Sequence, residues 1–570
     1  MNIIPYPKKI SESSTEIKYR AIKEKPAVGD ARVEKALGKL PYSPSGAELE
    51  INISGNSGEG YKLRLEEAVV RIDAQSAAGA FYAVQTLRQI FENKRVFCAE
   101  IEDGPDFAVR GFYHDITRGK VPKIETLKRL ADEMAYYKLN SLQLYVEHTF
   151  EFKEFADSIE RTGYISAEEL KELDSYCADN FIEFVPSLAT FGHLYELLEK
   201  DSYRQLAEAK ADNTIAWANR MAHHTIDPTR EESFELIKSL IDQYIACFTS
   251  DKLNICCDET FDLKRGRHRD ADTAKLYADF VCKIIDYVKS RGKTVMMWAD
   301  ILLQHPGEIS RIPEDTVLLN WDYEPDVTED KVKKIAALGR RQMVCPGTST
   351  WYKLSENVRA ATPNIIKMTE YGCKYGAAGV LNTNWGDWGN PCSIELSMHG
   401  MVLGAEKSWN VSADNNYDER MNDILYKNPR AAEYLERLSD IQEVTRWQTA
   451  AELYSNLSRN AGYSVKYPSK EELEGAIGGC FSLIGEINAD NWERTEYKEE
   501  LLLAAEGSAV IGEILAAYAG YGIARRTDTG QWLAKFSQMW RRKNKESELC
   551  EIQKMFETLE SCIIQGGCGA

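Results

Sequence analysis

Hydrophobic residues along the chain follow three successive patterns, and each predicts a different kind of structure. In residues 1–102, short segments of alternating apolar residues precede a helix-like run at 76–91, which is typical of a small α+β domain. In residues 103–410, short apolar strands alternate with amphipathic helices, whereas residues 411–570 favour a helical C-terminal domain. The alternating N-terminal segments lie at 50–54, 61–65 and 68–73, and the long C-terminal helical stretches at 431–457, 471–488 and 494–521.

The central part contains eight strand–helix units. Its strands are predicted at 109–113, 140–146, 181–186, 253–257, 294–298, 316–321, 341–345 and 378–384. Helix starts are marked as well, for example by a capping box at Ser166 and Glu169. Eight β/α units in about 300 residues have the size and order of a (β/α)8 TIM barrel. A doubly wound open sheet is the alternative, because periodicity does not show that a sheet closes.

The composition is that of a soluble globular protein with more than one domain. The 570 residues are 44% hydrophobic and 28% charged. With 89 acidic and 70 basic residues the net charge is −19, which repels nucleic acid and anionic membranes, so we expect neither as a partner. We also expect no membrane span, because no run of about 18 apolar residues stands out. A neutral ligand fits this charge best.

The cysteines and the first residues give an expectation about the cellular compartment. Thirteen cysteines occur without a repeating CxxC spacing, and their odd number favours neither a zinc ribbon nor a closed disulfide framework. Reduced thiols fit best. The first fourteen residues contain no apolar run of signal-peptide length, so we expect a cytoplasmic protein. The alternative is a secreted protein whose signal peptide has already been removed.

Polar and aromatic residues gather where the predicted barrel strands end, which is where TIM barrels carry their reacting groups. Asp258 and Glu259 follow the fourth strand. Alone, such a pair is ordinary among 89 acidic residues, and a solvated loop or a helix cap would explain it. Five of the eleven tryptophans also fall on these ends, and aromatic faces interspersed with polar groups are typical of sugar binding. The surrounding strand ends are 190–193, 298–300, 320–322, 351–352 and 384–388.

Over roughly residues 60–410, these motifs resemble glycoside hydrolase family 20, the β-N-acetylhexosaminidases. The helix-like run from Ala78 looks like the helix of the small N-terminal domain of that family. Residues 101–118 are similar to its first barrel strand, in which an arginine holds the 3- and 4-hydroxyls of the terminal sugar, and we assign this role to Arg110. Phe191-Gly192-His193 is similar to its Gly-His element, whose histidine supports the catalytic acid, and Asp258 and Glu259 are similar to its carboxylate pair.

The resemblance implies further site residues. Trp298, Trp321 and Trp385 would wall an acetamido pocket, and Asp387 would bind outer hydroxyls. A donor to the acetamido oxygen would come from the loop after the seventh barrel strand, from Tyr352 or from Trp351. The supporting groups would be Asp115, Glu147 and His148. The preceding Asn254-Ile-Cys-Cys257 differs from the glycine-rich, histidine-containing strand end usual in the family, which indicates a divergent bacterial-type branch.

The resemblance also implies an exo-acting, retaining reaction in which the acetamido group of the substrate is the nucleophile. Glu259 would be the general acid and base, and Asp258 would accept from the acetamido N–H and stabilise the oxazolinium intermediate. No metal or organic cofactor is implied. The substrate would be an oligosaccharide or glycoconjugate with a terminal β-linked N-acetylhexosamine. The sequence leaves open the choice between N-acetylglucosamine and N-acetylgalactosamine, and it allows a homodimer.

Three alternatives stay open at this point. A metal-dependent hydrolase on the same barrel would use Asp115, His193 and Asp258 as ligands, although these residues lack an HxH spacing. A non-catalytic amino-sugar-binding protein would keep the tryptophans but would not need an acid. The vicinal pair Cys256-Cys257 suggests redox chemistry, although two small apolar residues in a buried strand are the simpler interpretation.

Overall fold

Eight parallel strands close into a barrel in the computed structural model, which describes residues 1–157, 163–209 and 224–565. Closure is made by the last and first strands, which pair from Gly379 opposite Val109 to Asn384 opposite His114. The TIM barrel is confirmed, and the doubly wound alternative is wrong. Each predicted barrel strand overlaps one of the observed strands, which are β6 (Val109–Asp115), β7 (Ser141–Val146), β8 (Glu183–Leu188), β9 (Lys252–Asn254), β10 (Thr294–Trp298), β11 (Val317–Trp321), β12 (Gln342–Cys345) and β13 (Gly379–Asn384).

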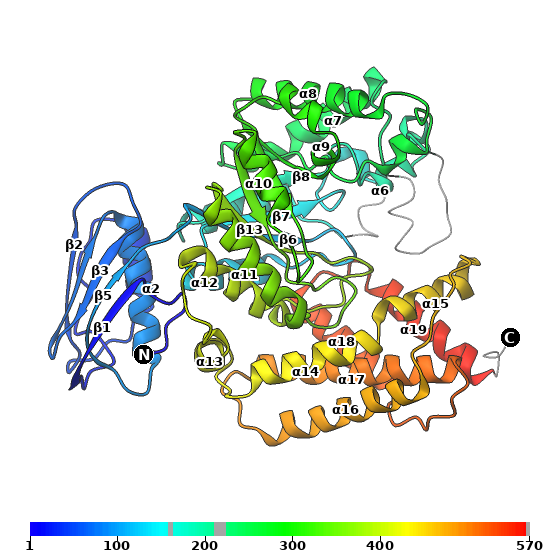
Figure 1. Cartoon of the computed structure of the whole chain (residues 1–570). Coiled ribbons are helices and arrows are strands. Elements are labelled where there is room, and N and C mark those ends of the chain that lie inside the picture. Colours follow the sequence, from blue (N-terminus) through cyan, green and yellow to red (C-terminus); the bar gives the residue numbers. More distant parts are fainter. Residues whose placement is uncertain (158–162, 210–223, 566–570) are drawn as a thin grey trace.

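Amphipathic helices surround the barrel (Figure 1), because each buries one apolar face against the strands. In α3, for example, the buried side chains include Leu127, Leu130 and Met134. The predicted capping box of Ser166 and Glu169 is present at the start of α5. In the described part of the barrel the helices are α3 (Ile124–Tyr136), α5 (Ala167–Ala178), α6 (Tyr195–Leu198), α7 (Glu231–Ile245), α8 (Thr273–Ser290), α9 (Asp300–Gln304), α10 (Asp330–Ala337), α11 (Val358–Lys374) and α12 (Met398–Trp409).

Strand β9 is shorter than predicted. It ends at Asn254, because the backbone at Cys256 and Cys257 turns into the left-handed region, with φ of 57° and 64°. Both side chains are buried, and burial raises the pKa of each thiol, which keeps the sulfur protonated and unreactive. This environment fits packing residues and gives no support to a redox pair. Asp258 and Glu259 are therefore carried by a tightly turned segment and not by the strand itself.

The N-terminal domain is a five-stranded sheet with α2 against one face (Figure 1). The strand order is β1-β5-β3-β4-β2. The sequence pattern missed β1, which is almost fully exposed and lacks apolar alternation, and it also missed β5. These elements are β1 (Lys9–Glu16), α1 (Ala31–Leu37), β2 (Glu48–Ile53), β3 (Tyr61–Leu65), β4 (Val69–Ala74), α2 (Ala77–Glu92) and β5 (Phe97–Asp103). The predicted boundary at residue 102 falls at the end of β5, and the one at 410 follows α12.

Arg110 joins this N-terminal domain to the barrel, which corrects its assignment as a sugar ligand. It is the second residue of β6, so it lies at the opposite end of the barrel from the strand ends that carry the predicted site. Its side chain is fully buried. It donates to Glu59 Oε2 at 2.6 Å and to the Lys138 carbonyl at 2.9 Å, and it stacks on Trp409. Arg110 is thus a structural contact between two domains.

Replacing Arg110 should weaken the contact between the N-terminal domain and the barrel. We expect Arg110→Met to lower the free energy of unfolding by about 3 kcal/mol, because it leaves Glu59 and two buried carbonyls without their donor. Thermal and urea unfolding measure this loss. Arg71→Met is the matched control, since Arg71 pairs with Glu50 on the exposed sheet surface and should contribute no more than about 0.5 kcal/mol. Equal losses in the two variants would contradict this assignment of Arg110.

The C-terminal helices pack below the barrel in Figure 1. The predicted stretch 431–457 is two helices, because the chain turns at Thr445 and Arg446. The helices described after the barrel are α13 (Tyr417–Met421), α14 (Ala431–Val444), α15 (Trp447–Arg459), α16 (Lys470–Ala489), α17 (Thr495–Tyr518), α18 (Thr529–Lys543) and α19 (Leu549–Ile564).

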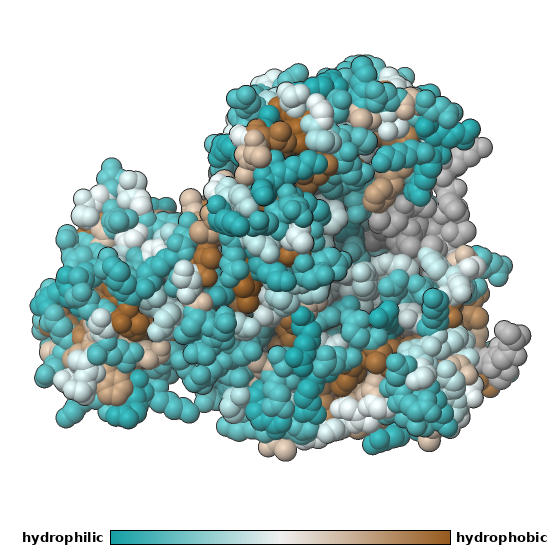
Figure 2. Space-filling view, in the orientation of Figure 1, coloured by the Kyte–Doolittle hydropathy of each residue, from teal (hydrophilic) through white to brown (hydrophobic). Residues whose placement is uncertain are grey.

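Among the described residues, helix α17 is long and apolar enough to span a membrane, contrary to the expectation from the sequence. However, 78% of its apolar window is buried inside the protein. It packs against α14, α15, α16, α18 and α19. Figure 2 shows a mostly hydrophilic face, on which apolar side chains form only small patches. Within this fold α17 is the central helix of the C-terminal domain.

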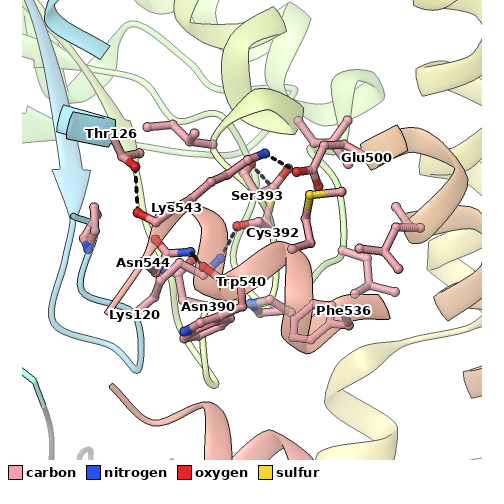
Figure 3. A pocket seen from close by; sticks show the side chains of 18 of the residues that line it. Lys120, Thr126, Asn390, Cys392, Ser393, Glu500, Phe536, Trp540, Lys543 and Asn544 are labelled. Carbon is pink, nitrogen blue, oxygen red and sulfur yellow. Dashed lines mark hydrogen bonds and ion pairs between the residues drawn. The ribbon is translucent and has the colours of Figure 1, made fainter. Parts of the chain in front are cut away.

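A buried network of ion pairs and hydrogen bonds connects this domain to the barrel (Figure 3). Lys543 forms ion pairs with Glu500 and Glu395, and its carbonyl accepts from Thr126 of α3. Lys120 donates to the carbonyl of Cys392, in the loop after β13, and burial lowers the pKa of Lys120 to about 8. The C-terminal helices therefore hold the loop after β13 in place.

Candidate functional site

A cavity of about 270 Å³ opens at the C-terminal end of the barrel. Most of the predicted site residues meet here, although they come from widely separated parts of the sequence. Its lining residues are Arg118, Asp258, Glu259, Trp298, Trp321, Tyr323, Tyr352, Trp385, Asp387 and Trp388. The cavity has the mixture of aromatic walls and few charged groups that is typical of small-molecule sites.

Aromatic rings form the floor and one wall of this cavity. Trp298 is fully buried and packs edge-on against Tyr113, with ring centroids 5.2 Å apart. Trp385 lies 5.9 Å from Trp298, and its indole N–H donates to the Tyr323 hydroxyl at 2.7 Å. Tyr323 in turn stacks on Trp321. Because each ring is held by another, the wall is rigid and can accept the flat apolar face of a ligand.

The two neighbouring carboxylates share one histidine. His193 Nε2 lies 3.3 Å from Asp258 Oδ2 and 3.4 Å from Glu259 Oε2. Burial alone would lower the pKa of His193, but the charge and hydrogen bond of Asp258 raise this pKa to about 9. The imidazole is therefore positively charged at neutral pH. The other oxygen of Asp258, Oδ1, is buried and has no hydrogen-bond partner among the described residues.

Glu259 is held so that it can carry a proton. Burial raises the pKa of its carboxyl, the charge of His193 opposes this, and the charge of Asp258 adds to it. Its backbone N–H donates to Asp300 Oδ2 at 3.1 Å. Burial and the charge of Asp258 raise the pKa of Asp300 to about 7. The raised pKa favours the protonated form of Glu259 that a general acid needs, while Asp300 fixes the backbone that carries Glu259.

Arg118, and not Arg110, is the arginine that lines the cavity. It contacts Asp387 at 3.0 Å and Asp115 at 3.3 Å, and its guanidinium lies over the ring of Trp385. Asp115 does not reach the cavity surface, but it accepts from the Gly386 N–H and so fixes the loop after β13. The arginine and Asp387 together form a polar edge of the cavity beside the ring of Trp385.

The predicted supporting groups Glu147 and His148 differ in position. Glu147 lies behind His193, with Oε1 4.0 Å from His193 Nδ1, and accepts from the Tyr145 hydroxyl at 2.9 Å. Burial favours its neutral form, but the neighbouring His148 ring and the charges of Arg118 and His193 lower its pKa to about 2. Glu147 is thus an anion that orients a cationic His193. The ring of His148 is absent from the cavity wall.

The two candidates that follow β12, the seventh barrel strand, also differ in position. Tyr352 lines the cavity, and its backbone N–H donates to the Asp387 carbonyl at 3.2 Å. Burial and the charge of Asp387 raise the pKa of Tyr352 to about 12, so its hydroxyl is a donor at neutral pH. Trp351 packs against Tyr323 from behind and is outside the lining set. Of these two neighbours, only Tyr352 is placed to touch a ligand.

Sequence reasoning passed over four groups that belong to this site: Arg118, Tyr323, Trp388 and Asp300. Tyr323 and Asp300 lie two residues beyond predicted strand ends, Trp388 is next to Asp387, and Arg118 lies five residues beyond the predicted end of the first barrel strand at 113. The rule that barrel sites form at C-terminal strand ends would have favoured Arg118 over Arg110. Nothing in the periodicity marked Tyr323, which acts through its contacts with Trp321 and Trp385.

The ligand set of the metal-hydrolase alternative is not assembled. Asp115 pairs with Arg118, whereas His193 faces Asp258 and Glu259. In the described ranges, the groups of three close metal-ligating side chains do not include Asp115, His193 and Asp258 together. The geometry instead provides a carboxyl whose pKa is raised by burial, a carboxylate oxygen without a hydrogen-bond partner among the described residues, and aromatic walls. Such a set suits acid catalysis on a neutral ligand that carries an N–H.

Known relatives match much of the chain at low identity. A β-hexosaminidase of Porphyromonas gingivalis is 26% identical over 53% of this chain and 46% of its own length. A β-hexosaminidase of Vibrio furnissii is 21% identical, over 57% of this chain and 58% of its own length. The chain therefore spans about half the length of these curated relatives.

Solved structures share the fold. A chitobiase from Flavobacterium johnsoniae superposes with a TM-score of 0.61 at 17% identity and covers 99% of both chains. An exo-β-N-acetylglucosaminidase from Vibrio harveyi, solved in complex with N-acetylglucosamine, gives a TM-score of 0.59 at 19% identity over 74% of this chain and 76% of its own. Residues 1–104 match the model for domain 2 of glycosyl hydrolase family 20, and residues 107–437 match that for its catalytic domain. Together with the cavity, these matches confirm the resemblance: the chain belongs to glycosyl hydrolase family 20.

Proposed function

We propose that this protein is an exo-acting, retaining β-N-acetylhexosaminidase that removes a terminal N-acetylhexosamine from β-glycosides by substrate-assisted catalysis. One observation carries the proposal. Asp258 holds one oxygen against His193 and presents a second, unpaired oxygen beside Glu259, whose pKa is raised by burial. An unpaired buried acceptor is costly unless a ligand satisfies it, and an acetamido N–H would do so.

The chemistry follows from these two carboxyl groups. In the first step the acetamido oxygen bonds to C1 while the bond from C1 to the leaving oxygen breaks, and Glu259 gives its proton to that oxygen. Asp258 accepts from the acetamido N–H and stabilises the positive oxazolinium. In the second step water attacks C1, Glu259 takes the proton, and the ring opens to the acetamido group. Two inversions at C1 give a β-product.

The proposed substrate follows from the shape and charge of the cavity. Trp298 closes its floor, which favours one terminal sugar over an internal unit of a chain. The aromatic wall would hold the acetamido group in line for attack, and Arg118 with Asp387 would bind the outer hydroxyls. The complex of the Vibrio harveyi enzyme with N-acetylglucosamine supports that sugar as the first substrate to test. N-acetylgalactosamine is the second.

The product stereochemistry tests the proposal directly. With an aryl N-acetyl-β-glucosaminide in deuterated water, NMR should show the β-anomer of the free sugar first, followed by mutarotation. The matching aryl β-glucoside lacks the acetamido group and should be hydrolysed at least about 10⁵-fold more slowly, since an intramolecular nucleophile is missing. Early α-product, or equal rates on the two glycosides, would rule out this mechanism.

The positive charge of His193 should affect the pH dependence of kcat/KM. His193 is cationic below pH 9 and lowers the pKa of Glu259. In His193→Gln the pKa of Glu259 should rise, so the alkaline limb of kcat/KM should move to higher pH while kcat falls. Because the folded pKa of His193 exceeds its unfolded value near 6.5, its stabilising contribution is full below pH 6.5 and lost through about pH 9.

Thermal melts at several pH values check the same point independently. The Tm difference between wild type and His193→Gln should be largest near pH 6 and should shrink above pH 9. His305→Gln is the control, because His305 lies at the end of α9 and outside the cavity wall. An unchanged alkaline limb in His193→Gln would disprove the proposed contact with Glu259.

A further inference from the structure

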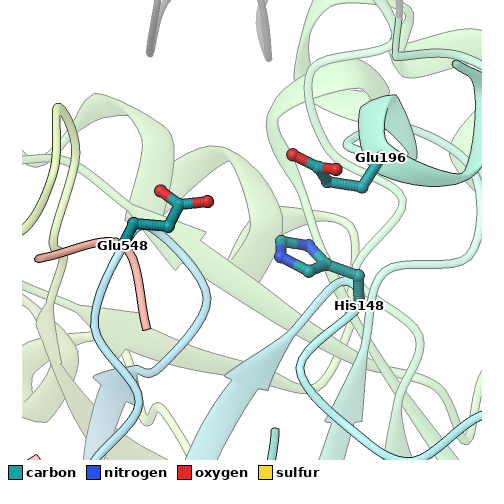
Figure 4. Close-up of side chains that lie close together, drawn as sticks. All are labelled: His148, Glu196 and Glu548. Atoms are coloured by element: carbon teal, nitrogen blue, oxygen red, sulfur yellow. The ribbon is translucent and has the colours of Figure 1, made fainter. Parts of the chain in front are cut away.

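A second cluster of ionisable side chains lies near the same end of the barrel. It consists of His148, which follows β7, Glu196 in α6, and Glu548, which immediately precedes α19. One ligand atom from each lies within 4.8 Å of the others. Figure 4 shows the three side chains converging on one gap from three separate segments of the chain. None of them lines the cavity of the proposed catalytic site.

The environment of His148 gives an independent reason to expect a ligand. Its side chain is 2% exposed, and neither ring nitrogen has a hydrogen-bond partner among the described residues. Its nearest charged neighbour within the described ranges is Glu147, whose Oε2 lies 3.8 Å from Nδ1, which is too long for a hydrogen bond. A buried imidazole without partners costs free energy, and in Figure 4 the ring is directed at the two carboxylates.

We propose that His148, Glu196 and Glu548 bind one divalent first-row transition-metal ion. One imidazole and two carboxylates suit Zn²⁺ and Mn²⁺, which take nitrogen and oxygen ligands together. Water would complete the coordination. The three donors already face one gap. Rotation of their side chains would therefore be enough to reach ligand-bond lengths of about 2.0–2.2 Å. The site is separate from the reaction centre and supplies no step of the hydrolysis.

The ion would attach the C-terminal domain to the catalytic end of the barrel. The backbone N–H of Glu548 donates to the Gly119 carbonyl at 3.1 Å, directly after Arg118. On the other side, His148 is adjacent to Glu147, which contacts Arg118 and His193. Metal binding would therefore stabilise the loop that carries Arg118. We expect a higher Tm as its main effect.

A second group with metal-ligating atoms provides a matched control. Glu208, Asp227 and His268 also lie within 4.8 Å of one another. Here His268 Nδ1 is already 2.7 Å from Glu208 Oε2, and Arg267 lies 3.5 Å from Asp227. Because these donors are engaged with each other and with a cation, this group should bind metal weakly.

The test is metal titration of the full chain after chelator treatment. Isothermal titration calorimetry with Zn²⁺ and, separately, Mn²⁺ should show one equivalent bound per chain for at least one ion, with a matching rise in Tm. His148→Gln should weaken that binding at least 100-fold and abolish the rise, whereas His268→Gln should leave both unchanged. Glu548→Gln provides a second variant in case His148→Gln fails to fold, which circular dichroism would show.

Three outcomes would overturn the proposal. The first is no saturable binding of either ion by the wild type. The second is wild-type affinity in both His148→Gln and Glu548→Gln. The third is loss of binding in His268→Gln alone, which would place the ion at the control group.

Discussion

Glu259→Gln should reduce turnover of an aryl N-acetyl-β-hexosaminide by about 10²–10⁴-fold. The amide keeps the size of the carboxyl but cannot donate a proton to the leaving oxygen. Because burial raises the pKa of Glu259, the wild type should lose activity on the alkaline side as this group ionises. The variant should lack that limb. Steady-state rates between pH 4 and 10 measure both effects.

Two further measurements on Glu259→Gln test its role as the acid: the rate with a better leaving group and the binding of an analogue. With a good leaving group such as dinitrophenol, the deficit of Glu259→Gln should shrink, since little protonation is needed. A thiazoline analogue of the oxazolinium should still bind. Glu324→Gln is the matched control, because Glu324 is exposed near the same barrel end but outside the cavity wall. Wild-type turnover in Glu259→Gln would exclude it as the acid.

Asp258→Asn should reduce turnover by about 10²–10³-fold, with a small change in substrate binding. The amide loses the negative charge that would face the oxazolinium, and it can turn an N–H toward the acetamido N–H. The deficit should therefore appear in kcat more than in KM, since the charge acts in the transition state. Binding of the positively charged form of a thiazoline analogue should weaken in the same variant.

The choice of leaving group separates Asp258 from Glu259. For Asp258→Asn the deficit should stay large with dinitrophenol, because formation of the oxazolinium is impaired whatever leaves. Asp322→Asn is the control, since Asp322 pairs with Lys331 at 2.8 Å and does not line the cavity. A deficit in Asp258→Asn that disappears with the better leaving group would contradict its proposed role beside the acetamido group.

The sequence by itself determined the order of the elements and the place of the chemistry. Alternation of short apolar strands with amphipathic helices is a local property, so it located all eight barrel strands and indicated the helical C-terminal domain. Asp258, Glu259, Trp298, Trp385 and Asp387 lie at strand ends or shortly after them, and parallel strands bring those ends together whatever the details of packing.

Only the tertiary structure decided which side chains share an environment. Arg110 and Arg118 are eight residues apart and chemically identical, but β6 carries them to opposite ends of the barrel. The left-handed turn at Cys256 and Cys257 aims the two carboxyl groups, and it depends on hydrogen bonds to β10 that no local pattern encodes. The partnerless ring of His148 and the burial of α17 likewise depend on distant segments. Periodicity reports whether a residue is apolar or polar, whereas pKa values, unpaired atoms and cavity walls arise from contacts between residues far apart in the chain.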